Sequence, residues 1–202
     1  IVFGCIPDDA RIFVEHINGK TVVNAGLSPE YAFGKLSSEN SQELEILVED
    51  NVASKLLSNI IPSDIRSRIK IEIIGSASSL SRQMGAIFQR GIKKKTLTIF
   101  DGDQRRLYKN NLKCACSMLE NSEQEFTDWF SKNTSYLPGD EWPEKWIINE
   151  NLKYAENLAK LVNGNVDITT TALIRGAGSE RHKEFYEASI ILGISESEML
   201  DR

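Results

Sequence analysis

From residue 44 to residue 100, short apolar runs alternate with longer amphipathic stretches, and this alternation limits the fold more than any other feature of the chain. It is typical of βαβ units, in which helices join parallel strands. The pattern predicts strands at Leu44–Val48, Ile69–Ile74 and Thr96–Phe100, with helices at Val52–Ile60 and Ser79–Arg90. Because the runs ILV, IEII and LTIF are largely apolar, we expect all three strands to be central and covered on both faces.

Different patterns flank this region. Arg11–Val23 contains two β-rich runs around Asn18-Gly19, which predicts an antiparallel ribbon. Residues 24–40 form a connector with a short helical patch near Tyr31–Leu36. After Asp103 we expect helices at Arg105–Leu119, Glu123–Asn133, Glu144–Leu161, Ile168–Ile174 and Glu180–Leu192. The expected fold is α/β, with a ribbon and connector (1–40), a Rossmann-like parallel sheet flanked by helices (41–135) and a helical C-terminal extension (136–202).

Composition excludes several classes of protein. With 41% hydrophobic and 26% charged residues, the 202-residue chain is an ordinary globular protein, and no apolar run approaches the ~20 residues of a membrane helix. The opening IVFGC lacks the pattern of a signal peptide and resembles a cut end, so we expect a fragment of a longer cytoplasmic protein without a membrane partner. Cys5, Cys114 and Cys116 form no disulfide framework, and reduced cysteines are expected.

Acidic residues follow two of the predicted strands. Glu49 and Asp50 come directly after the first strand, and Asp101 and Asp103 come after the third, separated by Gly102. In a parallel α/β sheet, ligands bind at the carboxyl ends of strands, so these acids should converge. Without an obvious basic partner they would repel one another unless a cation lay between them, and Mg²⁺ or Mn²⁺ suits carboxylate oxygens. The sequence therefore predicts a metal site able to act on phosphates, with one or two ions.

Simpler interpretations of the same residues stay open. Asp50 or Asn51 could cap the helix that follows the first strand, and Asp103 could cap the helix after the third. The segment Gly75–Ser79 could bind an anion, although an ordinary Ser N-cap is the more frequent meaning.

The net charge of −5 argues against nonspecific coating of DNA, but basic residues gather on both sides of the DGD segment. A solvated helix face explains each group as well as DNA contact does. The two groups are Arg90, Lys93, Lys94 and Lys95, and Arg105, Arg106, Lys109 and Lys113.

Three motifs together resemble the TOPRIM fold of topoisomerases, primases and certain nucleases. They are ILVED at Ile46–Asp50, IIGSAS at Ile73–Ser78 and IFDGD at Ile99–Asp103, and they match the fold in order and spacing. Within that superfamily the chain resembles the overcoming-lysogenization-defect (OLD) nucleases, in which an ATPase domain precedes TOPRIM. The ribbon and NAGLSPEYAFGKLS look like an ATPase tail, and LPGDEWPEKW at Leu137–Trp146 resembles the region after the OLD core.

The resemblance implies a metal-dependent DNA endonuclease, and such proteins occur in bacterial anti-phage defence systems, including some retrons. Glu49 would be the acid/base or metal-binding glutamate, and Asp101 and Asp103 would bind metal. Many members carry a further acid where this chain has Ala53, so Asp50 would have to act as the ligand instead, and two-metal chemistry stays open. Family members also use a late lysine on the phosphate, for which Lys145 and Lys183 are candidates.

The implied partners are DNA, an upstream ATPase domain of the same protein, further copies of the chain, and a protein or nucleic acid of a defence system. The sequence contains no Walker A pattern, so ATP hydrolysis is not assigned to these residues.

Two other functions remain as alternatives. A receiver-type signalling domain would use Asp101 as phosphoacceptor, but it would give Asp103 no role. A TOPRIM scaffold that has lost catalysis would explain Ala53, but it would not explain why Glu49, Asp101 and Asp103 are all present.

Overall fold

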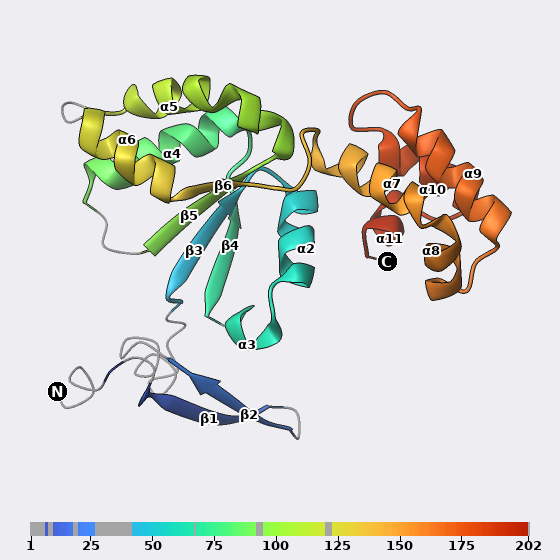
Figure 1. Ribbon diagram of the computed structural model, residues 1–202, viewed down its shortest axis with the longest axis horizontal. Helices are drawn as coiled ribbons and strands as arrows, with labels where there is room; N and C mark the ends of the chain where they lie inside the picture. Colours follow the sequence, from blue (N-terminus) through green and yellow to red (C-terminus); the bar gives the residue numbers. More distant parts are fainter. Residues whose placement is uncertain are drawn as a thin grey trace.

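The computed structural model describes residue 7 and residues 10–17, 20–26, 42–66, 68–91, 95–119 and 123–201. These residues form a four-stranded parallel sheet flanked by helices, a separate two-stranded ribbon and a C-terminal group of helices (Figure 1). The predicted α/β fold class, a parallel sheet flanked by helices with a ribbon and a helical C-terminal extension, is therefore confirmed. The proposed boundaries after residues 40 and 135 stay predictions.

The parallel sheet has the strand order β4-β3-β5-β6. Its strands are β3 (Leu44–Val48), β4 (Ile69–Ile73), β5 (Lys95–Phe100) and β6 (Thr134–Tyr136). The expectation that all three predicted strands are central is wrong for β4, which is an edge strand of the described sheet. Its sequence IKIEI alternates polar with apolar residues, and Ile73 remains 49% exposed. The strand β6 escaped prediction because a three-residue TSY segment carries no periodicity.

Alternate side chains of the central strands pack against different helices. On one face, Leu47 and Phe100 contact the helices α4 (Ala77–Gln89), α5 (Tyr108–Cys116) and α6 (Glu123–Lys132). On the other face, Ile46 and Val48 pack with Leu57 of α2 (Asn51–Ile60). A short separate helix, α3 (Ser63–Arg66), follows after Ile61 and Pro62. Figure 1 shows α4, α5 and α6 together on one side of the sheet and α2 on the other. This packing fixes the positions of the carboxyl ends of β3 and β5.

The predicted helix at 105–119 is divided into a 3-10 segment, η3 (Gly102–Leu107), and α5. The predicted helix at 144–161 is likewise divided at Tyr154. The C-terminal helices are α7 (Pro143–Lys153), α8 (Ala155–Leu161), α9 (Val166–Ala177), α10 (Glu184–Leu192) and α11 (Glu196–Asp201). Their apolar cluster includes Val52 of α2, so the helical extension packs directly against the sheet domain.

The ribbon pairs β1 (Ile12–Ile17) with β2 (Lys20–Ala25) in antiparallel register, as expected. Asn18-Gly19 and the helical patch at 31–36 lie outside the described residues. Arg68, just before β4, donates hydrogen bonds to Glu43 and to the Gly26 carbonyl, which connects the ribbon to the sheet domain. No helix in the described part of the chain is both long and apolar enough to cross a bilayer.

Candidate active site

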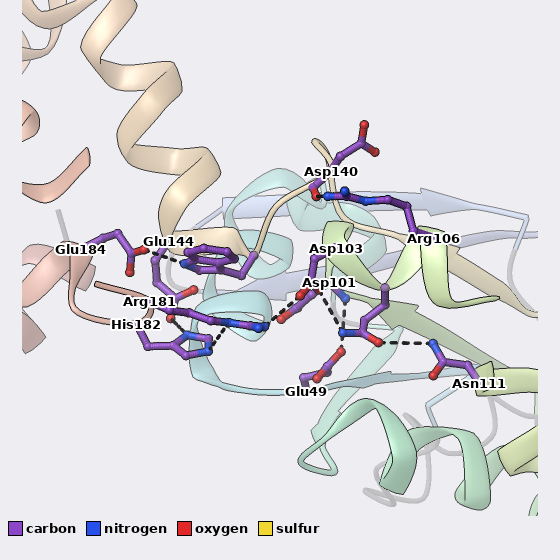
Figure 2. Close-up of polar contacts among 12 residues, drawn as sticks. Glu49, Asp101, Asp103, Arg106, Asn111, Asp140, Glu144, Arg181, His182 and Glu184 are labelled. Carbon is purple, nitrogen blue, oxygen red and sulfur yellow. Dashed lines mark hydrogen bonds and ion pairs between the residues drawn. The ribbon is translucent and has the colours of Figure 1, made fainter. Parts of the chain in front are cut away.

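Glu49 and Asp101 lie side by side at the carboxyl end of the sheet. Each residue directly follows a central strand, β3 or β5, and these strands are neighbours in parallel register. The backbone N–H of Asp101 donates a hydrogen bond to Glu49 Oε1 at 3.5 Å (Figure 2). The prediction that these two acids converge is thus confirmed by the geometry, whereas their chemical roles stay predictions.

Burial makes it unfavourable for both carboxyl groups to ionise. Asp101 is 5% exposed, and burial, followed by repulsion from Glu49, raises its pKa from the ordinary 3.8 to about 8. Burial also raises the pKa of Glu49 from 4.5 to about 7, although its hydrogen bond from Asp101 opposes that shift. Asp101 Oδ1 is buried and has no hydrogen-bond partner among the described residues. A bound cation would stabilise both groups as carboxylates.

Asp103 occupies a different environment on η3. Its Oδ2 atom forms an ion pair with Arg181 Nη2 at 2.8 Å, and its Oδ1 accepts a hydrogen bond from Gln104 Nε2 at 3.1 Å. Gln104 Oε1 in turn accepts from Asn111 Nδ2 at 3.5 Å. The expectation of an acidic cluster without a basic partner is therefore wrong at Asp103. Arg181 lies 78 residues further along the chain, so no local spacing could have identified it.

Asp50 acts as the N-cap of α2. Its Oδ1 accepts a hydrogen bond from the backbone N–H of Ala53 at 2.9 Å, which confirms the simpler interpretation of this acid. Its charge still contributes to raising the pKa values of Glu49 and Asp101. The proposed role of Asp50 as a metal ligand stays a prediction.

The two other capping hypotheses have different outcomes. Ser76 caps α4 by accepting a hydrogen bond from the Ser79 N–H at 3.4 Å, so the ordinary Ser-cap interpretation of Gly75–Ser79 is confirmed. Asp103 lies within η3, and the residue at the N-cap position is Asp101, which makes no side-chain capping bond. The capping interpretation of Asp103 is therefore wrong.

A loop at residues 137–142 crosses the DGD segment. A Cβ atom added to Gly102 would lie 2.7 Å from the Gly139 carbonyl oxygen and 2.8 Å from that of Glu141, so a side chain at this position would push the loop away. Arg105 donates to the Gly139 and Leu137 carbonyls and pairs with Asp140. Gly102 thus permits contact between two protein backbones.

The basic group after the DGD segment consequently has two parts. Arg105 and Arg106 bind the loop, since Arg106 Nη2 donates to the Asp140 carbonyl at 2.6 Å. Lys109 and Lys113 are exposed on α5. In the other group, Lys93 and Lys94 lie outside the described residues.

Residues from the C-terminal extension surround Arg181. The Arg181 guanidinium lies 4.8 Å from the centroid of the Trp142 ring, and Trp142 Nε1 donates to the fully buried Glu184 at 2.7 Å. Arg181 Nε donates to His182 Nε2 at 3.2 Å, and His182 Nδ1 lies 3.2 Å from Glu144 Oε1 (Figure 2). Sequence reasoning gave none of these residues a role, although Trp142 and Glu144 belong to the LPGDEWPEKW motif.

The two candidate lysines have partners away from the acids. Lys145 Nζ donates to the Ala177 carbonyl at 2.8 Å, and Lys183 Nζ pairs with Glu180 at 2.6 Å. Among the described residues, the basic side chain that pairs with an acid of this site is instead Arg181.

The acidic site fits a divalent cation in part. Glu49 and Asp101 supply carboxylate oxygens of the kind that Mg²⁺ or Mn²⁺ prefers, and Asp101 Oδ1 is buried and unpartnered within the described ranges. Both oxygens of Asp103 are engaged, and no group of three His, Cys, Asp or Glu side chains among the described residues is arranged to hold a metal. The fit of a third ligand therefore requires Asp103 to release Arg181.

A cavity of about 540 Å³ lies between α2 and the C-terminal helices. Its lining includes the apolar residues Leu56, Ile148, Leu173 and Phe185, together with Lys55. No carboxylate lines it within the described part of the chain, so it offers no metal site.

Comparisons with known proteins give one structural likeness. No family model matches the chain, and no curated protein matches it. A solved structure of the C-terminal region of the Xanthomonas campestris pv. campestris OLD protein is similar, with 14% sequence identity over 79% of this chain and 83% of that chain. The TM-score is 0.42, and a likeness of this degree carries no argument about function.

Proposed function

We propose that this chain is a metal-dependent DNA endonuclease of TOPRIM type that hydrolyses phosphodiester bonds. The observation that supports it is the adjacent pair of the partly buried Glu49 and the buried Asp101, at the ends of two neighbouring parallel strands. Two carboxyl groups held this close, with pKa values raised to about 7 and 8, are stabilised as carboxylates by a cation. An unpartnered oxygen alone does not mark a ligand, because Oε2 of Glu144 and Oε2 of Glu184 are also buried without a partner among the described residues. Asp101 differs in the adjacent carboxyl group of Glu49, which raises its pKa further.

The chemistry follows from the oxygen donors. Glu49 and Asp101 would hold Mg²⁺ or Mn²⁺, and Asp103 would join them when Arg181 leaves it. Such an ion, when bound, supplies charge stabilisation to phosphate oxygens and activates water. The Glu49 carboxylate would either hold the ion or accept a proton from the attacking water, so both of its expected roles remain within the proposal.

The wider setting is proposed from the motif resemblance. The chain would be the nuclease part of an OLD-like ATPase–nuclease in the bacterial cytoplasm, acting in anti-phage defence. Its partners would be DNA, the upstream ATPase domain, further copies of the chain, and a defence-system protein or nucleic acid.

A second candidate function is a TOPRIM scaffold without catalysis. It is favoured by one observation, namely that both oxygens of Asp103 are already engaged by Gln104 and Arg181. The two candidates differ in whether the carboxylates of Glu49 and Asp101 are needed for cleavage.

The test is DNA cleavage by the protein with Mg²⁺ or Mn²⁺ and with EDTA, using supercoiled and linear substrates. We expect Glu49→Gln, Asp101→Asn and the double variant each to lose roughly 100-fold or more of the rate. Asp140→Asn is the matched control, because it makes the same acid-to-amide change at an exposed residue near the site. Undiminished cleavage by the double variant, or cleavage in EDTA, would exclude the proposal, and no cleavage by wild type would favour the scaffold.

A further inference from the structure

We propose that Asp103 exchanges Arg181 for a metal ion when Arg181 binds a phosphate of the DNA substrate, so that metal binding and DNA binding strengthen each other. This inference rests on the proposed function and adds to it a residue of the C-terminal extension that contacts substrate. It follows from which atoms are engaged at the acidic site and which are not.

The first step concerns Asp103. Its side chain is 17% exposed, and each carboxylate oxygen has a partner: Gln104 Nε2 on Oδ1 and Arg181 Nη2 on Oδ2. Asp101 Oδ1, two residues earlier, is buried and has no partner in the described part of the chain. Asp101 therefore has a carboxylate oxygen without a partner among the described residues, whereas Asp103 is already bound to the Arg181 guanidinium.

The second step concerns Arg181, whose guanidinium occupies Asp103 Oδ2 and so competes with a metal ion for it. Its side chain is 54% exposed, so a phosphate can approach it from solvent. A guanidinium binds phosphate oxygens in a bidentate fork as well as it binds a carboxylate. A substrate phosphate next to Arg181 thus provides the alternative partner that the exchange needs.

The third step concerns the support of the loop that carries Arg181. The guanidinium lies 4.8 Å from the centroid of the Trp142 ring, and the hydrogen bond from Trp142 to Glu184 holds that ring in place. The next residue, His182, has a positive φ of 62°, and its Nδ1 atom lies within hydrogen-bond distance of Glu144. Because Arg181 Nε donates to His182 Nε2, the ring proton lies on Nδ1 and can be donated to Glu144.

These contacts hold Trp142 and His182, which in turn contact the Arg181 guanidinium at its Cζ and Nε atoms. The Nη2 atom, which binds Asp103, is the part of the guanidinium that has to change partner. A phosphate bound at Nη2 would lie close to the carboxylates that would hold the ion.

The exchange predicts two opposite effects of one substitution. In Arg181→Gln, Asp103 is free to face a cation, so Mn²⁺ measured by calorimetry without DNA should bind about 10-fold more tightly than to wild type. The same variant has lost its phosphate contact, so a fluorescently labelled DNA oligonucleotide, measured by anisotropy in EDTA, should bind about 10-fold more weakly. Neither measurement depends on cleavage.

Arg175→Gln is the matched control. Arg175 is an exposed arginine on α9 whose Nε forms an ion pair with Glu187 at 2.8 Å, so its recognised partner is not one of the acids at the strand ends. It should leave both affinities unchanged. Arg181→Lys keeps the charge and should give smaller changes in both directions, which keeps the test available if Arg181→Gln melts at a lower temperature than wild type.

The remaining outcomes decide against the exchange. Unchanged Mn²⁺ affinity with weaker DNA binding would mean that Arg181 contacts phosphate without competing for Asp103. Weaker Mn²⁺ binding would mean that the Arg181 contact supports the metal site. Failure of the proposed function has a different signature, namely undiminished cleavage by the Glu49→Gln, Asp101→Asn double variant.

Discussion

The two carboxylates at the strand ends and the two beside them have opposite surroundings. Glu49 and Asp101 lie side by side, and removal of their carboxyl groups from solvent raises both pKa values. Asp101 Oδ1 also lacks a partner among the described residues. Asp50 and Asp103 instead have specific partners, the Ala53 N–H for one and Arg181 with Gln104 for the other. Four acids within two short segments are therefore not equivalent.

This difference indicates how a metal-binding acid can be distinguished from a structural one. A carboxylate whose lone pairs are already used caps a helix or forms an ion pair, and it gains little from a cation while those partners stay bound. A buried carboxylate with an unused oxygen and a like-charged neighbour gains much from one. The following changes test this division of the acidic edge, from the largest expected effect to the smallest.

The largest effect should be on the pH dependence of stability without metal. Because the folded-state pKa values of Glu49 and Asp101 are raised to about 7 and 8, their contribution is fully present below about pH 4 and is lost as pH rises through 7 and 8. We expect the free energy of unfolding, measured in urea with EDTA, to fall over that window. Asp101→Asn should flatten the fall, as should added Mg²⁺.

Asp140→Asn is the control for this pH profile, since Asp140 is exposed. It should keep the full fall in stability. The division between buried and paired acids fails if wild type and Asp101→Asn show the same dependence on pH.

The next effect concerns the contact between the DGD segment and the 137–142 loop. Gly102→Val would bring side-chain atoms against the Gly139 and Glu141 carbonyls, and it should lower the free energy of unfolding by roughly 1–3 kcal/mol. Chemical denaturation measures the loss. The exposed turn residue Gly91, where an added Cβ meets nothing within 4 Å, provides a comparison through Gly91→Ala, although its φ of 60° adds some strain of its own. If Gly102→Val is as stable as wild type, the close approach is not a constraint.

A smaller effect should separate the cap from the ligands. Asp50→Ala removes the N-cap of α2 and should cost about 1 kcal/mol of stability, whereas Asp50→Ser should retain most of it, since serine also caps helices well. Both variants should keep Mn²⁺ binding. Loss of Mn²⁺ binding in the serine variant, with stability retained, would show that Asp50 is a ligand after all.

The smallest effect on stability is expected at Asp140, an exposed residue of the 137–142 loop. Asp140→Asn breaks the ion pair with Arg105, but Arg105 also binds the Gly139 and Leu137 carbonyls. The loss of stability should be below about 1 kcal/mol, as is usual for exposed ion pairs. Thermal unfolding at low and high salt measures it. A loss of several kcal/mol would mean that Asp140 and Arg105 organise the loop.

Much of the sheet could be predicted from the sequence. Short apolar runs separated by amphipathic helices place Glu49 and Asp101 at the ends of β3 and β5, and parallel pairing brings those ends together. Strand order was less accessible, because the polar residues of IKIEI signal an edge strand only once the neighbouring strands are known.

The partner of Asp103 could not be predicted, for a physical reason. Arg181 lies in the turn between α9 and α10, and it reaches the DGD segment only because the C-terminal helices pack on α2 through Val52 and Ile148. Periodicity identifies helices but not how they pack against one another. The family resemblance suggested a late lysine instead, and its two candidates, Lys145 and Lys183, have partners elsewhere.

The acidic site is tested most directly by Mn²⁺ binding to the wild-type protein and to the Glu49→Gln, Asp101→Asn double variant, measured by calorimetry at pH 7 and pH 8. We expect wild type to bind Mn²⁺, more tightly at pH 8 because both carboxyl groups must be ionised, and the double variant not to bind it. Equal binding by the two proteins would contradict the assignment of Glu49 and Asp101 as the metal site.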